Sequence, residues 1–281
     1  MSLKLTVKSL LPPVALEVFR RLNRRNMVHF VGSYKDWQTA EKKAYGYDAA
    51  SILDKVIVAT RKVISGEAKF ERDSMTFDTV LYPFPIIAIL LRAASENENN
   101  LAVLDFGGAL GSSYFQCRDF LHGVKNLHWC VVEQPHFVEA GNQYFTSEAL
   151  LFFSKVKDSQ CIHRANVVLF SGVLQYLPEP LTVIKEVIEI GADYIVIDRN
   201  PFVAKGETVL SLQKVPKNIV HSSYPVWLFN ESKFRQVFSG KYSEVASFDA
   251  LDGAIGWGHL KANFKGIVFK KIKEIGSVLE A

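Results

Sequence analysis

The sequence predicts an α/β protein built on a doubly wound, mostly parallel sheet, and three observations support this class. Short, continuously apolar segments alternate with helical stretches from about residue 100 onward, a pattern typical of parallel strands that are buried on both faces. The first of these segments ends in a glycine-rich loop at residues 105–113. The 281 residues, 48% of them hydrophobic, are enough to bury a full core.

The chain before residue 96 is expected to form a helical cap. Apolar side chains recur at three- and four-residue spacing over residues 48–63, which predicts an amphipathic helix. The polar stretch at residues 95–100 is rich in turn-forming residues and indicates a boundary. We therefore divide the chain into a cap at residues 1–95 and an α/β domain at residues 96–281.

Five strands and a late sixth strand are expected in the α/β domain. The five apolar segments are residues 101–106, 128–133, 150–153, 166–170 and 194–198. The late strand is expected at residues 264–271, reached by a loop at about 242–248, and a hairpin there would close the sheet. In a doubly wound sheet of this kind, ligands bind beyond the carboxyl ends of the strands.

Composition narrows the range of partners. The 33 Lys and Arg against 29 Asp and Glu leave a net charge of +4, which is too small to favour nucleic acid as the main partner. The three cysteines have no CxxC spacing, so neither a disulfide framework nor a metal site is expected, and a reducing cytoplasm is favoured. Four arginines at residues 20–25 make the N-terminal segment basic, which allows a weak peripheral contact with an anionic membrane.

The glycine loop is the most informative segment. It lies between a predicted strand and a predicted helix, where backbone N–H groups can bind a phosphate or a carboxylate. The dinucleotide fingerprint GxGxxG keeps only its first glycine, Gly107, because Ala109 and Ser112 stand at the other two positions. A P-loop is also a poor match, because the loop has no lysine.

The same loop resembles the first motif of class I S-adenosylmethionine-dependent methyltransferases, Asp/Glu-x-Gly-x-Gly-x-Gly. Asp105, Gly107 and Gly111 stand at matching positions, and Ala109 replaces the middle glycine. A carboxylate at Asp105 would repel a pyrophosphate but suits a ligand with an α-ammonium and a sulfonium group. The resemblance implies a Rossmann-like, seven-stranded sheet with an antiparallel last strand, and S-adenosyl-L-methionine as the cofactor.

Two further segments fit this methyl donor. Glu133 lies 22 residues past Gly111 at the end of the second strand, where a carboxylate can accept hydrogen bonds from both ribose hydroxyls. Ser171 and Gly172 follow the fourth strand and would border the methyl end of the donor. The expected donor-binding residues are therefore Asp105, Phe106, Gly107, Gly108, Gly111, Glu133, Gln134, Ser171 and Gly172.

A narrower resemblance extends over most of the chain. Residues 45–48, 70–74, 104–108, 171–177 and 197–202 are similar to a family of bacterial methyltransferases associated with surface-polysaccharide and related glycan clusters. This resemblance implies a methyltransferase whose acceptor is a sugar, a glycan or another small molecule.

Candidate acceptor and catalytic residues are sought near the carboxyl ends of the strands. Asp198 and His221 are candidate bases, which are needed only if the acceptor is a hydroxyl. The candidate acceptor-binding residues are Tyr176, Arg199, Tyr47 and Arg72, the last of which belongs to the cluster Glu71–Asp73 on a possible lid. Each of these residues also has a structural interpretation, as a surface side chain, a helix cap, a buried ion pair or part of the core.

Three functions remain open from the sequence. A methyltransferase is favoured by the glycine loop together with Glu133. A nicotinamide-dependent oxidoreductase has the same fold class, but it is disfavoured by the incomplete GxGxxG. A non-catalytic scaffold subunit that binds the donor is compatible with Ala109, and with Asn166, which begins the fourth strand where these methyltransferases often have Asp.

Overall fold

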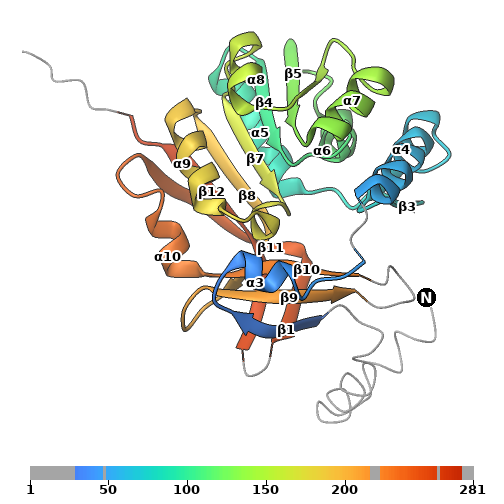
Figure 1. Ribbon diagram of the computed structural model, residues 1–281. Helices are drawn as coiled ribbons and strands as arrows, with labels where there is room; N and C mark the ends of the chain where they lie inside the picture. The colour runs from blue at the N-terminus through green and yellow to red at the C-terminus, as the bar shows by residue number, and fades with distance from the viewer. Residues whose placement is uncertain (1–28, 47–48, 216–221, 258–259, 274–281) are drawn as a thin grey trace, which may run out of the picture.

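The computed structural model describes residues 29–46, 49–215, 222–257 and 260–273, and its centre is a parallel sheet (Figure 1). The five predicted strands are present and run parallel to one another. In spatial order they are β6 (Leu150–Phe153), β5 (Asn126–Val132), β4 (Asn100–Phe106), β7 (Val167–Ser171) and β8 (Tyr194–Val203).

The chain closes this sheet with an antiparallel hairpin. β12 (Leu260–Lys271) pairs antiparallel with β8, and β11 (Tyr242–Trp257) pairs antiparallel with β12. The predicted Rossmann-like sheet with an antiparallel last strand is confirmed, and these seven strands belong to a sheet that has ten strands in the described chain. The predicted loop at residues 242–248 is wrong, because these residues begin β11. Most of them are exposed, as suits an edge strand, and they mix polar with apolar residues, which hides the strand in the sequence.

Both faces of the parallel sheet are covered, as the continuously apolar strands predict. Successive residues of one strand join different core clusters: Val167 and Leu169 pack on one face, while Val168 and Phe170 pack on the other. The helices on the first face are α5 (Phe84–Glu96), α6 (Ser112–Cys117) and α7 (Pro135–Tyr144). Those on the second face are α8 (Val156–Ile162), α9 (Pro180–Ile190) and α10 (Glu231–Gln236).

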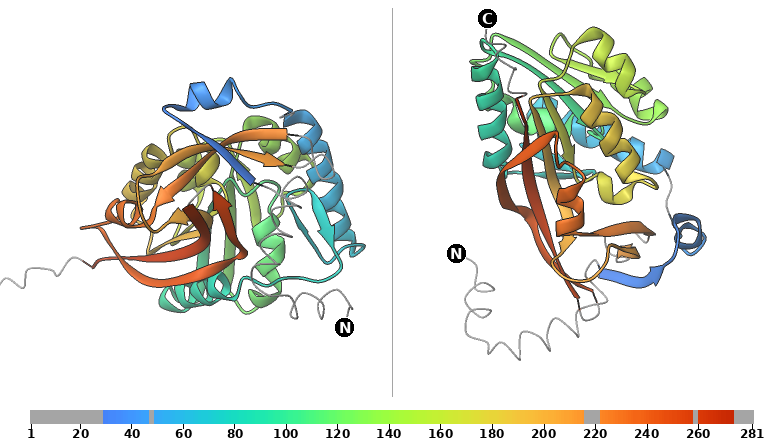
Figure 2. Two further views of the ribbon diagram at one scale, coloured as in Figure 1. Left: turned by 90° about the horizontal axis from the view of Figure 1, so that it is seen from below. Right: turned by 90° about the vertical axis from the view of Figure 1, so that its left-hand side faces the viewer.

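A second, antiparallel sheet lies beyond the carboxyl ends of the parallel strands (Figures 1 and 2). It consists of β1 (His29–Tyr34), β9 (Val209–Val215) and β10 (Ser222–Asn230). It joins the main sheet where β10 runs parallel to the last residues of β8, with Phe229 opposite Phe202. None of these three strands is expected from the sequence.

The N-terminal helical cap is not confirmed. The helix expected at residues 48–63 is present as α4 (Ala49–Ser65), and a short α3 spans Trp37–Glu41. The remaining elements differ from a cap: β1 belongs to the antiparallel sheet, and β2 (Phe70–Arg72) and β3 (Met75–Phe77) form a hairpin. The buried face of α5 covers the main sheet.

The basic segment considered for membrane contact, residues 20–25, lies outside the described residues. Within the described part of the chain, every helix is too short or too polar to cross a membrane.

We expect Asn166→Asp to destabilise the fold, because Asn166 connects β7 to β4 through both ends of its amide. Its Oδ1 accepts from the N–H of Ala102 at 2.9 Å, and its Nδ2 donates to the carbonyl of Asn100 at 3.1 Å. A carboxylate can keep the first bond but places an acceptor against an acceptor at the second. We expect a loss of about 1–3 kcal/mol in the free energy of unfolding, measured with urea. The exposed Asn142→Asp on α7 is the control, and an equal effect of both substitutions would contradict this role.

Candidate functional site

Three of the predicted donor-binding segments meet at the carboxyl edge of the parallel sheet. Gly107 directly follows β4, and its N–H donates to the carbonyl of Val132, the last residue of β5, at 2.9 Å. Glu133 therefore begins the loop beside the glycine loop. Ser171 ends β7, which pairs with β4 on its other side. The sheet topology thus brings together segments that are far apart in the sequence.

The glycine loop is built over a buried carboxyl group. Asp105 is 1% exposed, and its Oδ2 accepts from the indole N–H of Trp129 at 3.0 Å. Its Oδ1 has no hydrogen-bond partner among the described residues. A Cβ atom on Gly108 would lie 2.5 Å from Oδ2 of Asp105, so only glycine lets the loop rest on this carboxyl group. Burial raises the pKa of Asp105 to about 7; the bond from Trp129 opposes this shift, and the charge of Glu133 adds to it.

The loop takes a left-handed backbone at each position of the glycine motif. Gly107 has φ 72° and Gly111 has φ 93°, and a Cβ atom at Gly107 would collide with Val173. Ala109, which replaces the middle glycine, also has a positive φ of 50°. For an alanine this conformation costs roughly 1–2 kcal/mol. The departure from the motif at Ala109 is therefore accommodated as backbone strain.

Glu133 directly follows β5, beside the glycine loop. Its Oε2 accepts from the backbone N–H of Gln134 at 2.8 Å. Burial raises the pKa of Glu133, and the backbone N–H groups of Gln134 and Ala109 act in the opposite direction. The carboxylate thus lies between the end of β5 and the glycine loop.

Two other expected donor-binding residues, Gln134 and Phe106, have different surroundings. Gln134 is exposed and immediately precedes α7, without a side-chain hydrogen bond to the helix start. The ring of Phe106 packs against Phe170, with 5.5 Å between ring centroids. Phe106 therefore contributes to the core at the end of β4, whereas the Gln134 side chain stands at the surface beside Glu133.

The end of β7 and the middle of β8 bring four predicted residues together. The hydroxyl of Ser171 donates to Oδ2 of Asp198 at 2.8 Å, and the N–H of Gly172 donates to the carbonyl of Asp198 at 2.9 Å. Asp198 is buried. β8 pairs with β7 as far as Asp198 and with β10 from Phe202 onward, so Arg199 lies where this strand exchanges neighbours. Arg199 has φ 56°, and its guanidinium lies 3.2 Å from Oδ2 of Asp73 in the β2–β3 turn.

Tyr176 joins a polar network that sequence reasoning missed. It lies in the 3₁₀ helix η3 (Leu174–Tyr176), and its hydroxyl donates to Oε1 of Gln213 at 3.0 Å. Gln213 in turn donates to the hydroxyl of Tyr224 at 3.2 Å, and the two tyrosine rings are nearly perpendicular at 5.3 Å. Burial raises the pKa of Tyr176. Gln213 and Tyr224 face each other across β9 and β10, a pairing that no local pattern indicates.

The remaining predicted residues are Tyr47, His221 and Arg72. Tyr47 and His221 lie outside the described residues. Arg72 is in β2, with its guanidinium carbon 5.4 Å from the centroid of the Phe70 ring. Its neighbour Glu71, from the same predicted cluster, does reach the glycine loop, because the hydroxyl of Ser112 donates to Oε1 of Glu71.

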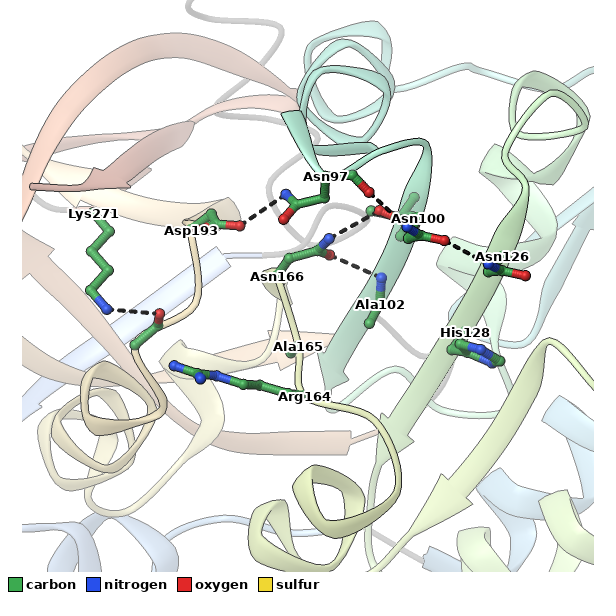
Figure 3. A pocket seen from close by; sticks show the side chains of 12 residues that line it. Asn97, Asn100, Ala102, Asn126, His128, Arg164, Ala165, Asn166, Asp193 and Lys271 are labelled. Atoms are coloured by element: carbon green, nitrogen blue, oxygen red, sulfur yellow. Dashed lines mark hydrogen bonds between the residues drawn. The ribbon is translucent and has the colours of Figure 1, made fainter. Parts of the chain in front are cut away.

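A polar cavity of about 620 Å³ lies at the opposite, amino end of the strands (Figure 3). Its asparagine side chains bond to one another and to the strand starts: Asn126 donates to Oδ1 of Asn100 at 2.6 Å, and Asn97 donates to Asp193 at 3.0 Å. Asn166, noted above as a departure from a methyltransferase pattern, belongs to this group. These amides align the beginnings of the strands and are remote from the glycine loop.

Neither a family model nor a curated protein matches the sequence. The similarity to bacterial methyltransferases of glycan clusters therefore stays a prediction.

Solved structures resemble the chain at low sequence identity. One is the 1,6-didemethyltoxoflavin-N1-methyltransferase of Burkholderia thailandensis with S-adenosylhomocysteine, which is 15% identical with a TM-score of 0.42, over 82% of this chain and 95% of that one. The N-terminal domain of EvdMO1 with bound S-adenosylhomocysteine is 10% identical, with a TM-score of 0.46, over 76% and 97%. CalS10, an amino pentose methyltransferase of Micromonospora echinaspora with bound S-adenosylmethionine, is 9% identical, with a TM-score of 0.43, over 67% and 91%.

The buried carboxyl group of Asp105 gives a pH-dependent prediction. The folded chain keeps its proton up to about pH 7, whereas the unfolded chain releases it near the ordinary value of 3.8. The contribution of Asp105 to stability is therefore most favourable below that value and is lost as the pH rises to about 7. Asn at this position cannot ionise and still accepts from Trp129. We compare the free energy of unfolding of Asp105→Asn with that of the parent. We expect this difference to shift in favour of the variant by roughly 2–3 kcal/mol between pH 5 and pH 8.

Urea unfolding at the two pH values measures this advantage. The exposed Asp249→Asn serves as the matched control for the same substitution outside the buried site. An Asp105→Asn advantage of the same size at both pH values would show that the carboxyl group is ionised without cost in the folded chain.

Proposed function

We propose that the chain is an S-adenosylmethionine-dependent methyltransferase that acts on a hydroxyl or amine of a sugar, a glycan or another small molecule. The observation that carries the proposal is the convergence of the glycine loop, Glu133 and the Ser171–Gly172 turn at one edge of a doubly wound sheet. This edge includes the point where the strand order reverses, between β4 and β7, which is where such sheets bind their ligands.

The residues present fit such a donor. The loop from Gly107 to Gly111 would hold its amino-acid end, and this loop rests directly on the buried carboxyl group of Asp105. Glu133 would bind the ribose hydroxyls, with Gln134 toward the adenine. Ser171 and Gly172 would border the methyl end. When bound, the donor supplies an electrophilic methyl group on its sulfonium.

The acceptor side would be formed by the ends of β7 and β8 and by the antiparallel sheet. Arg199 and the Tyr176–Gln213–Tyr224 network present hydrogen-bonding groups there, which suit a polar acceptor such as a sugar. Most of the rate enhancement would come from holding acceptor and donor in line. For a hydroxyl acceptor, Asp198 is the candidate to take up the proton, since its carboxyl group already accepts from Ser171.

The two alternatives from the sequence differ from this proposal in ligand and turnover. An oxidoreductase would bind a nicotinamide cofactor, whose pyrophosphate Asp105 disfavours. A scaffold subunit would bind the donor without transferring its methyl group.

We expect calorimetry to show binding of S-adenosylmethionine and S-adenosylhomocysteine, and none of NADH or NADPH. Glu133→Ala should weaken binding of S-adenosylhomocysteine about 10- to 100-fold, because hydrogen bonds to a charged group are lost. The exposed Glu148→Ala is the control and should bind like the parent. Binding of a nicotinamide cofactor instead would overturn the proposal, and donor binding without turnover on a panel of sugars and amines would favour the scaffold.

A further inference from the structure

The hairpin formed by β2 and β3 lies against the first turn of α6, the helix that follows the glycine loop. Glu71 in β2 accepts from the hydroxyl of Ser112, which directly follows Gly111. One turn further along α6, Gln116 donates to the carbonyl of Leu81. The chain before the parallel sheet therefore reaches the glycine loop and places a carboxyl group beside it.

The carboxyl group of Glu71 is buried, and in the described part of the chain only one of its two oxygens has a hydrogen-bond partner. Glu71 is 2% exposed, and its Oε2 finds no hydrogen-bond partner in the part of the chain that the structure describes. Leaving a buried acceptor unpaired is unfavourable, because the group has lost its hydrogen bonds to water. A ligand group that donates a hydrogen bond to Oε2, above all a cationic one, would recover this cost.

The surroundings of Glu71 keep it protonated in the free protein. Burial raises the pKa of Glu71 to about 8, and the nearby charge of Asp73 acts in the same direction. The backbone N–H of Ser74 and the guanidinium groups of Arg72 and Arg199 act in the opposite direction but do not outweigh burial. At neutral pH the group is thus a neutral acid that an approaching cation would ionise.

We propose that the Glu71 carboxyl group binds the α-ammonium group of the methyl donor. The inference rests on the proposed function, since it assumes that the amino-acid end of the donor lies on the glycine loop. The position of Ser112 immediately after Gly111 places Glu71 at that end. The other buried carboxyl group there, Asp105, is bonded to Trp129 and lies beneath Gly108, whereas Glu71 contacts Ser112 just beyond the end of the loop.

Pairing with an ammonium group would change the protonation state of Glu71. The free protein holds a proton on Glu71 at pH 7, and the carboxylate paired with an ammonium does not. Binding of the donor or its product therefore releases this proton to the buffer. The pairing also predicts that the contribution of Glu71 to affinity depends on the ammonium group of the ligand and not on its nucleoside.

Calorimetry with two ligands tests this assignment. S-adenosylhomocysteine carries the ammonium group, whereas 5′-methylthioadenosine has the same nucleoside but lacks the amino-acid end. At pH 7 we expect Glu71→Gln to weaken S-adenosylhomocysteine about 10- to 100-fold and to leave 5′-methylthioadenosine unchanged. In buffers of different ionisation enthalpy, the parent should release about one proton per S-adenosylhomocysteine bound, and Glu71→Gln close to none.

Two controls distinguish the loss of a ligand contact from a general disturbance of the fold. Gln is isosteric with the neutral acid and can still accept from Ser112, so the thermal midpoint of Glu71→Gln should match the parent. Glu67→Gln, on an exposed glutamate that pairs with Lys62, should bind both ligands like the parent. Proton release by the parent is a measurement that needs no variant.

Three outcomes would contradict either the assignment of Glu71 or the proposed function. Unchanged S-adenosylhomocysteine affinity and proton release in Glu71→Gln would overturn the assignment, and would be the result if the carboxyl group instead receives an amine of the acceptor. Equal weakening of both ligands would also overturn it, because Glu71 would then shape the whole pocket. Binding of neither ligand by the parent would reject the proposed function itself.

Discussion

The burial of the Asp105 carboxyl group is the constraint on which the rest of the site depends. An ionisable group in this position is costly, and the chain surrounds it with an indole N–H from β5 and a glycine that lets the loop lie directly on it. The loop can then follow the left-handed path through Gly107, Ala109 and Gly111. Because the N–H of Gly107 bonds to the end of β5, the same arrangement fixes where Glu133 stands.

The two ends of the parallel sheet carry different kinds of polar side chain. At the amino end, asparagine side chains such as Asn166 use their amides to hold neighbouring strands in register. At the carboxyl end, Asp105, Glu133 and Asp198 are acids gathered within a few strand widths. The asparagine at the start of β7 is thus explained by the strand contacts it makes. It does not by itself favour a scaffold over an enzyme, because it is remote from the glycine loop.

The sequence predicts what depends on local pattern and misses what depends on distant pairing. The five parallel strands and α4 were predictable because their apolar residues recur within a few positions. β9, β10 and β11 were not, because edge and antiparallel strands carry mixed residues whose partners lie far along the chain. Among the site residues, the glycine loop and Glu133 follow from spacing, whereas the bond between Gln213 and Tyr176 exists only through the pairing of β9 with β10.

Backbone strain gathers where the chain segments of the site meet. Of the six non-glycine residues with positive φ in the described structure, four lie at this edge: Asp73, Ser74, Ala109 and Arg199. Such residues cost roughly 1–3 kcal/mol each and persist only where their surroundings hold them. Here the ion pair of Asp73 with Arg199 connects the β2–β3 turn to β8, and the bond of Glu71 with Ser112 connects β2 to the start of α6. The strain at the turn is therefore retained by contacts that reach both sides of the proposed site. A hairpin that served only to fill space would need neither the strained turn nor a buried carboxyl group, and this argues that the N-terminal segment is part of the site.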